Sequence, residues 1–230
     1  MLQHVFQTSG KDFKLLEIIN LNKSFKKGDY TLNVLNNFCL KVDDGERVAI
    51  VGPSGAGKST LLQIIGGLDK PDSGSVVFNG DSVFDKKGRQ LDRYRNSAVG
   101  FVFQFHYLLE DFTALENVMI PALIAGENRG DAKKRAEDLL ARVGLSDRSD
   151  HFPTELSGGE QQRTSIARAL MNNPKMILAD EPTGSLDRKN SEEVFSMFDL
   201  MKQDGITVLI VTHDESIADA CDRKIEMEKS

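Results

Sequence analysis

One glycine-rich octapeptide constrains this chain more than any other feature of its sequence. Residues 52–59 read GPSGAGKS and match the pattern G-x-x-x-x-G-K-S/T. A short β-branched run at 47–51 precedes the octapeptide, and a helical pattern at 59–65 follows it and ends at Gly66. Strand, glycine loop and helix together hold phosphate groups, because backbone N–H groups turn inward and the helix N-terminus favours anions. The sequence therefore predicts a loop that binds a nucleoside triphosphate.

The loop residues make up most of the expected nucleotide site. Lys58 is expected to reach the β- and γ-phosphates, and the Ser59 hydroxyl to bind Mg²⁺. An ordinary glycine-rich turn is the alternative, and chance would produce this pattern in on the order of one chain in a hundred of this length. The expected nucleotide-binding residues here are Gly52, Pro53, Ser54, Gly55, Ala56, Gly57, Lys58, Ser59 and Thr60.

Length and charge narrow the function classes. The 230 residues can form one large α/β domain or a domain with a subdomain. With 29 Lys and Arg against 35 Asp and Glu, the net charge of −6 disfavours a nucleic-acid partner, which usually needs a basic face. No run of about 18 apolar residues could span a bilayer, and residues 1–14 lack the apolar core of a secretory signal. We therefore expect a cytoplasmic protein that reaches a membrane only through a partner.

The order of apolar runs predicts the fold class. Strands alternating with helices indicate an α/β fold, a P-loop NTPase core with a mixed sheet, helices on both faces and an antiparallel part near the N-terminus. From 112 to 173 only helical patterns occur, the clearest at 131–143. We expect one nucleotide-binding domain over 1–230, with 15–104 and 174–230 as core and 105–173 as an inserted helical subdomain. The predicted strands are 15–19, 34–42, 48–51, 75–78, 99–103, 176–179, 207–211 and 224–227.

A second part of the phosphate site is indicated where an apolar strand ends in two carboxylates, Asp180 and Glu181. Burying a carboxylate at a strand end is costly unless a cation or a hydrogen-bond donor compensates for it. Beside a phosphate loop the natural cation is Mg²⁺, which Asp180 would hold directly or through water. Glu181 is then suited to polarise the attacking water as a general base. A solvated acidic turn is the alternative.

Residues 156–163 read LSGGEQQR and lead into a helical run at 165–170. A serine and two glycines before a helix leave N–H groups exposed, which makes a second candidate anion site. For this segment alone a simple N-capped helix is at least as good an interpretation. Two phosphate-facing elements in one chain suggest a dimer that encloses the nucleotide.

These motifs resemble those of the ATP-binding subunits of ABC transporters, and the resemblance covers nearly the whole chain. The segment LSGGE at 156–160 is similar to the signature motif of this family. The resemblance implies that Ser157, Gly158 and Gly159 contact the γ-phosphate of ATP held by the opposite subunit.

The same resemblance assigns roles to residues that follow the order of the family motifs. Gln104 would sense Mg²⁺ and the attacking water and link them to the membrane partner. Asp187 would communicate across the dimer, and His213 would be the switch histidine that contacts the γ-phosphate. The catalytic set implied in this way is Glu181, His213, Lys58 and Gln104, and the metal set is Ser59, Gln104 and Asp180.

An aromatic residue that stacks on adenine is usually a tyrosine after the first strand in this family. Phe25 has the usual spacing here, and Tyr30 is its competitor. Stacking needs only a π face, so we prefer Phe25.

Three kinds of ABC protein compete for the assignment. DNA-handling members insert a long coiled coil between the phosphate loop and the signature, where this chain has no heptad repeat. Soluble translation-type members carry two cassettes in one chain, and this chain has one. The transporter interpretation is therefore preferred.

Within transporters, residues 103–118 read FQFHYLLEDFTALENV, which resembles the LolD family of bacterial lipoprotein-releasing systems. Macrolide-export MacB and division-associated FtsE proteins share the general form and stay as alternatives. The resemblance implies ATP and Mg²⁺ as cofactors, a homodimer formed on ATP binding, LolC/LolE-like permease partners and a place at the cytoplasmic face of the inner membrane.

Several side chains in this stretch are too apolar for a freely solvated loop. Either they belong to the core, or they line a groove that accepts a cytoplasmic helix of the membrane subunit. Both interpretations stay open for Phe105, Tyr107, Leu108, Leu109 and Phe112.

Overall fold

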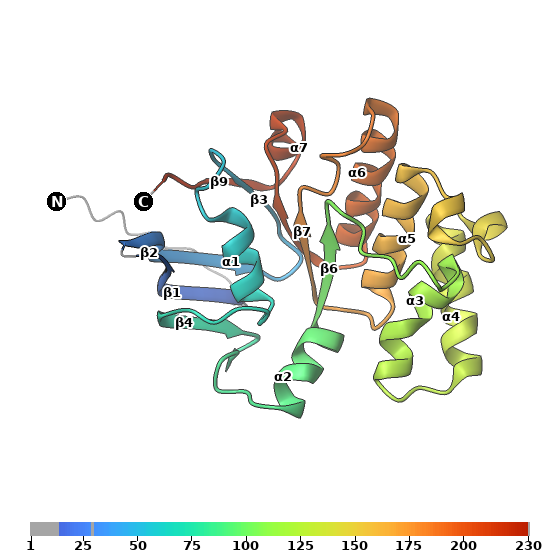
Figure 1. The fold of residues 1–230 in the computed structure, drawn as a ribbon, viewed down its shortest axis with the longest axis horizontal. Coiled ribbons are helices and arrows are strands. Elements are labelled where there is room, and N and C mark those ends of the chain that lie inside the picture. Colours follow the sequence, from blue (N-terminus) through green and yellow to red (C-terminus); the bar gives the residue numbers. More distant parts are fainter. Residues whose placement is uncertain (1–13, 29, 230) are drawn as a thin grey trace.

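The computed structural model describes residues 14–28 and 30–229. Its N-terminal part is an antiparallel sheet in the order β2-β1-β4-β5 (Figure 1). The strands are β1 (Lys14–Lys27), β2 (Tyr30–Asp43), β4 (Ser73–Phe78) and the short β5 (Asp81–Ser82). The predicted antiparallel part near the N-terminus is confirmed.

A second sheet is entirely parallel and has the order β6-β7-β8-β3-β9. Residues of β3 and β8 are buried along their whole length, as expected for central strands covered on both faces. The α/β fold prediction is confirmed, and its mixed sheet is resolved into two sheets of opposite type. The strands are β3 (Arg47–Val51), β6 (Val99–Phe103), β7 (Met176–Asp180), β8 (Thr207–Val211) and β9 (Arg223–Glu226).

Alternate side chains of the parallel sheet belong to two different hydrophobic clusters. In β7, Met176 and Leu178 pack with α1 (Lys58–Ile65) and the antiparallel sheet, whereas Ile177 and Ala179 pack with helices on the other face. This alternation follows from the two-residue period of a strand. It places α1 between the two sheets (Figure 1).

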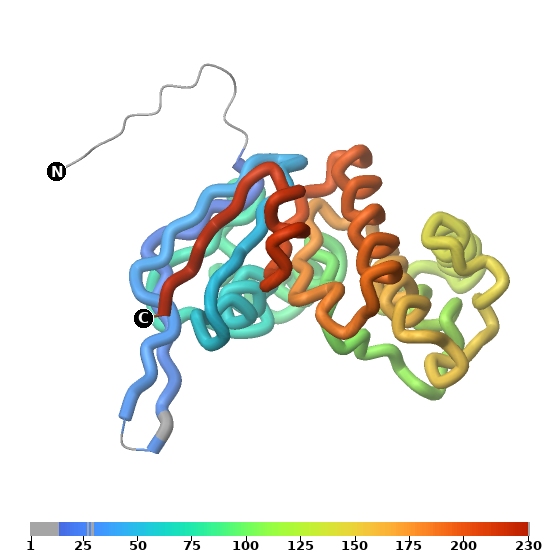
Figure 2. The backbone as a smooth tube through the Cα atoms, turned by 90° about the horizontal axis from the view of Figure 1, so that it is seen from above, coloured from blue at the N-terminus to red at the C-terminus, as the bar shows by residue number. Residues whose placement is uncertain are grey.

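The segment between β6 and β7 forms helices and loops. Figure 2 shows these helices at the end of the molecule opposite β1 and β2. Their residues share one hydrophobic cluster with β6 and β7, so the division at 105–173 is kept as a proposal. The helices of the segment are α3 (Ala114–Ile124), α4 (Arg129–Arg142), α5 (Gly158–Leu170) and the 3-10 turns Ser146–Arg148 and Pro153–Glu155.

The remaining helices flank the sheets. They are α2 (Arg89–Arg93), a π-helical turn (Tyr94–Ala98), α6 (Arg188–Gln203) and α7 (Glu215–Asp219). Over residues 14–28 and 30–229, no helix is both long enough and apolar enough to cross a bilayer.

Candidate functional site

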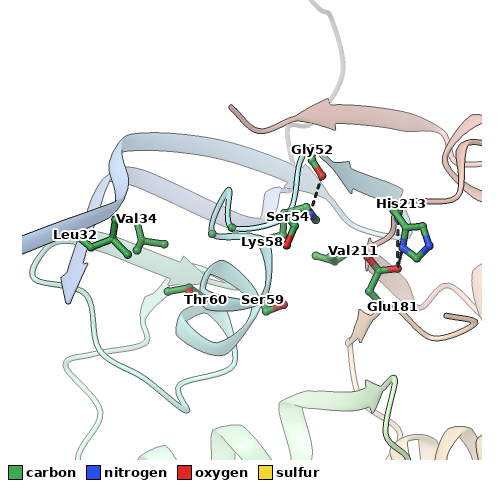
Figure 3. Close-up of a pocket in the computed structure, with 12 residues that line it drawn as sticks. Leu32, Val34, Gly52, Ser54, Lys58, Ser59, Thr60, Glu181, Val211 and His213 are labelled. Carbon is green, nitrogen blue, oxygen red and sulfur yellow. Dashed lines mark hydrogen bonds and ion pairs between the residues drawn. The ribbon is translucent and has the colours of Figure 1, made fainter. Parts of the chain in front are cut away.

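A cavity of about 500 Å³ opens at the carboxyl ends of β3, β7 and β8 (Figure 3). Ends of parallel strands meet at one edge of a sheet, and this edge is where open α/β sheets bind ligands. The glycine loop that joins β3 to α1 forms the floor of the cavity. Its lining residues are Leu32, Val34, Gly52, Ser54, Gly55, Gly57, Lys58, Ser59, Thr60, Glu181, Val211 and His213.

Glycine is required in this loop by its backbone. Gly52 has a φ of 145° and Gly57 a φ of 91°, and a Cβ on Gly57 would lie 2.8 Å from Cγ1 of Val34. The loop turns back on itself, so that Lys58 Nζ donates to the carbonyl oxygens of Gly52 at 2.8 Å and Pro53 at 3.1 Å. Two carbonyl groups of the glycine loop therefore hold the Lys58 ammonium at the cavity. Pro53 and Ala56 belong to the loop but stand outside the cavity lining.

Ser59 and Asp180 face each other from α1 and β7. The Ser59 hydroxyl donates to Asp180 Oδ1 at 3.1 Å. Burial raises the pKa of the Asp180 carboxyl, an effect that the Ser59 hydrogen bond and the Lys58 charge oppose. In the described part of the chain, no group of three or more His, Cys, Asp or Glu side chains could hold a metal alone. One hydroxyl and one carboxylate fit Mg²⁺, which takes one or two protein oxygens and completes its shell with water and phosphate.

Glu181 adopts a backbone conformation that is unusual for a residue with a side chain. Its φ is 48°, and such strain concentrates at functional sites. Its N–H donates to the carbonyl of Val211 at 2.9 Å, which fixes the start of the turn after β7. Its Oε2 accepts from the His213 backbone N–H at 3.3 Å and lies 2.8 Å from His213 Nδ1 (Figure 3). Two predicted catalytic residues are thus in direct contact.

Gln104 begins the segment after β6. Phe103, the residue before it, pairs with Asp180 across β6 and β7. The Gln104 side chain lies against Gly184, where a Cβ would be 3.1 Å from Nε2, and Ser185 Oγ donates to the Gln104 carbonyl at 3.4 Å. Gln104 is therefore near the carboxylate pair but outside the lining of the cavity.

The signature segment lies at the N-terminus of α5. Ser157 Oγ accepts from the Glu160 N–H at 3.3 Å, and Glu160 Oε2 accepts from the Ser157 N–H at 2.8 Å. This capping box leaves Ser157 exposed. Because α5 and α1 cover opposite faces of the parallel sheet, one chain does not bring Ser157, Gly158 and Gly159 to its own glycine loop.

The apolar side of the cavity comes from β2, which sequence reasoning missed. Leu32 and Val34 line it, while Phe25 and Tyr30 are exposed by 42% and 57% and stand outside the lining. Phe25 pairs with Leu32 across β1 and β2, so both side chains point to one face of the sheet. The two-residue period of β2 puts Leu32 and Val34 on one face of the strand, but it does not show that this face meets the glycine loop.

Comparisons with known proteins agree with this geometry. The model of the family described as ABC transporter matches residues 35–184. The chain is 51% identical over 214 residues to the lipoprotein-releasing system ATP-binding protein LolD of Syntrophotalea carbinolica, covering 93% of this chain and 94% of that protein. It is 52% identical over 214 residues to the LolD of Bacteroides thetaiotaomicron, covering 93% and 96%.

Solved structures agree as well. The dimeric ATP-binding cassette MJ0796, in a post-hydrolysis state bound to ADP and Pi, superposes with a TM-score of 0.87 at 40% identity, covering 94% of this chain and 96% of that chain. A second dimeric structure of that cassette has a TM-score of 0.87 at 41% identity, covering 93% and 94%. A strand-end cavity floored by a glycine loop, and relatives of this similarity over this length, lead to one assignment. The chain belongs to the ABC transporter family of ATP-hydrolysing subunits, and within that family to the LolD group.

Proposed function

We propose that this chain is the ATP-hydrolysing motor subunit of a bacterial lipoprotein-releasing system at the cytoplasmic face of the inner membrane. The observation that carries the ATPase chemistry is the contact between Glu181 and His213 at the edge of the glycine-loop cavity. The cargo follows from the names of relatives that are 51% and 52% identical over 93% of the chain.

The glycine loop would bind the phosphates of ATP. Lys58 would turn from the carbonyls of Gly52 and Pro53 to the β- and γ-phosphate oxygens, which offer its ammonium a full negative charge. Ser59 and Asp180 would hold Mg²⁺, which when bound neutralises charge on those phosphates. Leu32 and Val34 would pack against the sugar or base, with Phe25 beside them on the same face of the sheet.

Glu181 would be the general base. Its carboxylate accepts a proton from the water that attacks the γ-phosphorus, while the bond from that phosphorus to the β,γ-bridging oxygen breaks to give ADP and phosphate. His213 would orient this carboxylate through the contact of 2.8 Å and approach the γ-phosphate itself. Gln104, near the same strand ends, would link the state of the site to the membrane partner.

Two copies would form each complete site. The position of the signature segment favours a head-to-tail dimer, because Ser157 and Gly158 are exposed at the start of α5, on the face opposite α1. Gly159, the third residue of the predicted set, is buried. Dimeric cassettes of the same fold support this arrangement.

Membrane partners would dock on residues 105–112, which we name the docking segment. Phe105, Tyr107, Leu109 and Phe112 are exposed by 67%, 65%, 48% and 41%. Four large apolar side chains exposed within eight residues are typical of an interaction surface. We propose that LolC/LolE-like permeases place a cytoplasmic helix here, so that membrane contact is made through partners and no nucleic acid is bound.

The substitution Glu181→Gln tests the ATPase assignment. It keeps the shape and removes the base, so hydrolysis should fall at least about 100-fold while ATP binding persists and an ATP-bound dimer accumulates. Phosphate release and gel filtration with ATP measure both effects, with Glu137→Gln on α4 as a control. Wild-type turnover in the Glu181→Gln protein would remove Glu181 as the base.

Alanine substitution of Tyr107 and Leu108 tests the docking segment. Recovery of permease subunits with the tagged protein from detergent extracts should fall about tenfold, since a buried aromatic anchor contributes at least 1–2 kcal/mol to a typical interface. ATP binding should be unchanged. Full recovery would argue against this surface, and co-purification of an export permease or a division protein would favour the MacB-type or FtsE-type alternative.

A further inference from the structure

The backbone of the docking segment is held from inside the molecule. Arg168 of α5 donates to the carbonyl oxygens of His106 at 2.7 Å and Tyr107 at 2.6 Å. The buried Asn117 of α3 donates to the carbonyls of Leu109 at 3.0 Å and Phe112 at 2.9 Å. Helices α3 and α5 therefore satisfy the main chain of the segment while its large side chains face solvent.

One side chain, Gln161 of α5, contacts both the docking segment and the entry to the signature. Its Nε2 donates to the carbonyls of Pro153 at 2.9 Å and Leu156 at 3.1 Å. Its Oε1 lies 3.1 Å from Nδ1 of His106. Because two carbonyls fix the amide nitrogen, the amide oxygen faces His106 and must accept a hydrogen bond from its Nδ1–H.

The state of His106 agrees with this arrangement. Its Nε2 is buried and finds no hydrogen-bond partner in the described residues. Burial lowers the pKa of His106, although its hydrogen bond to Gln161 acts in the opposite direction. The unpartnered Nε2 and the contact with Gln161 fit a neutral ring whose proton is on Nδ1 and directed at Gln161.

A cavity of about 360 Å³ lies between the docking segment and the segment before the signature, the two parts of the chain that Gln161 contacts. Phe105, His106 and Tyr107 form part of one wall, and Pro153 and Gln161 form part of the other. An occupant of this cavity would touch the docking segment and the segment before the signature at the same time. Leu156, whose carbonyl Gln161 holds, directly precedes Ser157.

We infer that Gln161 is a positioning residue that couples the docking segment to the N-terminus of α5. A partner that displaces His106 shifts the Gln161 amide, and this shift moves the Leu156 carbonyl and with it Ser157, which meets ATP on the opposite copy. Arg168 keeps the segment on α5 while this happens. The inference deepens the proposed partner site and rests on it for the identity of the occupant.

The link itself is testable without a partner, by hydrogen exchange of the isolated chain. His106→Phe removes one end of the contact and should speed amide exchange in residues 153–160 roughly fivefold, the effect of one hydrogen bond. Gln161→Leu also loses the hydrogen bonds to the Pro153 and Leu156 carbonyls and should speed exchange at least as much. His106→Asn keeps an N–H near the position of Nδ1 and should exchange like wild type. Gln203→Leu at the end of α6 is the matched control. If His106→Phe leaves exchange in 153–160 at the wild-type rate, the inference is overturned.

The consequence is testable in the purified complex with its permease. The permease should change the ATP concentration that gives half-maximal hydrolysis by wild type. In the Gln161→Leu complex this change should be about fivefold smaller, while co-purification is retained. His106→Asn should keep the full change. An undiminished change in the Gln161→Leu complex would refute the coupling. Failure of wild type to co-purify would refute the partner site, and the exchange result would then decide the link alone.

Discussion

At the scale of single residues, the charged groups of the cavity already have hydrogen-bond partners from the chain itself. Lys58 donates to two carbonyls of its own loop, and Glu181 is in contact with His213. Such contacts hold the groups near the geometry needed later, so ordering them on ATP binding costs less conformational entropy.

Loss of the Lys58 ammonium should therefore weaken nucleotide binding. In Lys58→Ala we expect affinity for ATP to fall at least about tenfold, since charge-assisted hydrogen bonds to phosphate contribute about 1.5–3 kcal/mol each. Isothermal titration calorimetry measures the loss, and Lys175→Ala, an exposed position before β7, is the control. Wild-type affinity in Lys58→Ala would show that the ammonium stays on the loop carbonyls when ATP is bound.

Residue types and spacing were sufficient to predict the polar half of the site. Lys58, Ser59, Asp180, Glu181 and His213 lie at three strand ends that fold to one edge. The apolar half was not predicted, because Leu32 and Val34 carry no motif. Their place at the cavity depends on how the antiparallel sheet packs over α1, which pattern within one strand does not specify.

At the scale of elements, the N-terminus of α5 depends on a carboxylate. Glu160 accepts from the Ser157 N–H and hydroxyl, both at 2.8 Å, and pairs with Arg148 at 3.0 Å. The hydrogen bond from the Ser157 backbone N–H is the largest cause that holds the pKa of Glu160 below its ordinary value of 4.5. A carboxyl whose pKa is lowered by folding stabilises the fold above its unfolded pKa, and this stability is lost as the pH falls through the folded pKa.

The capping box should therefore make part of the stability pH-dependent. Glu160→Gln should lose up to about 1 kcal/mol at pH 7, where wild type has the ionised acceptor, and the difference should shrink below about pH 4. Urea unfolding of both proteins at the two pH values measures it, with Glu137→Gln as the matched exposed substitution on α4. A difference that stays constant with pH would show that Glu160 caps the helix without its charge.

Elements were predicted best where burial dictates the pattern. The runs 99–103 and 207–211 match β6 and β8 to the residue, because both faces of these strands pack in hydrophobic clusters and their residues are mostly apolar. The two residues of β5 and the π-helical turn Tyr94–Ala98 were missed. Both are too short to show a period. The pairing of the strands was also not predicted, because the residue pattern of a strand does not specify its neighbours. A single mixed sheet was predicted, whereas the structure has two sheets.

At the scale of the whole molecule, helices α1 and α5, which follow the glycine loop and the signature segment, lie on opposite faces of the parallel sheet. On the proposed function, one chain binds ATP with its loop and does not reach the same ATP with its signature. If two copies complete each other around a two-fold axis, every site takes residues from both chains. A chain with a defective loop and a chain with a defective signature should then form one intact site when they pair.

Mixing two inactive variants tests this arrangement directly. Lys58→Ala removes the loop function and Ser157→Arg blocks the signature, so each protein alone should hydrolyse less than about one hundredth as much ATP as wild type. A dimer of one copy of each has one site with both defects and one with none. An equal mixture should then recover up to about a quarter of wild-type activity, because half of the dimers are mixed and each has one intact site. The double variant Lys58→Ala/Ser157→Arg mixed with Lys58→Ala is the control, since no dimer in that mixture has an intact site. The first mixture could instead be no more active than the two variants measured separately. That result would mean that hydrolysis needs two intact sites or that each site is built from one chain. Measuring ATP-dependent association of the mixed pair separates these outcomes.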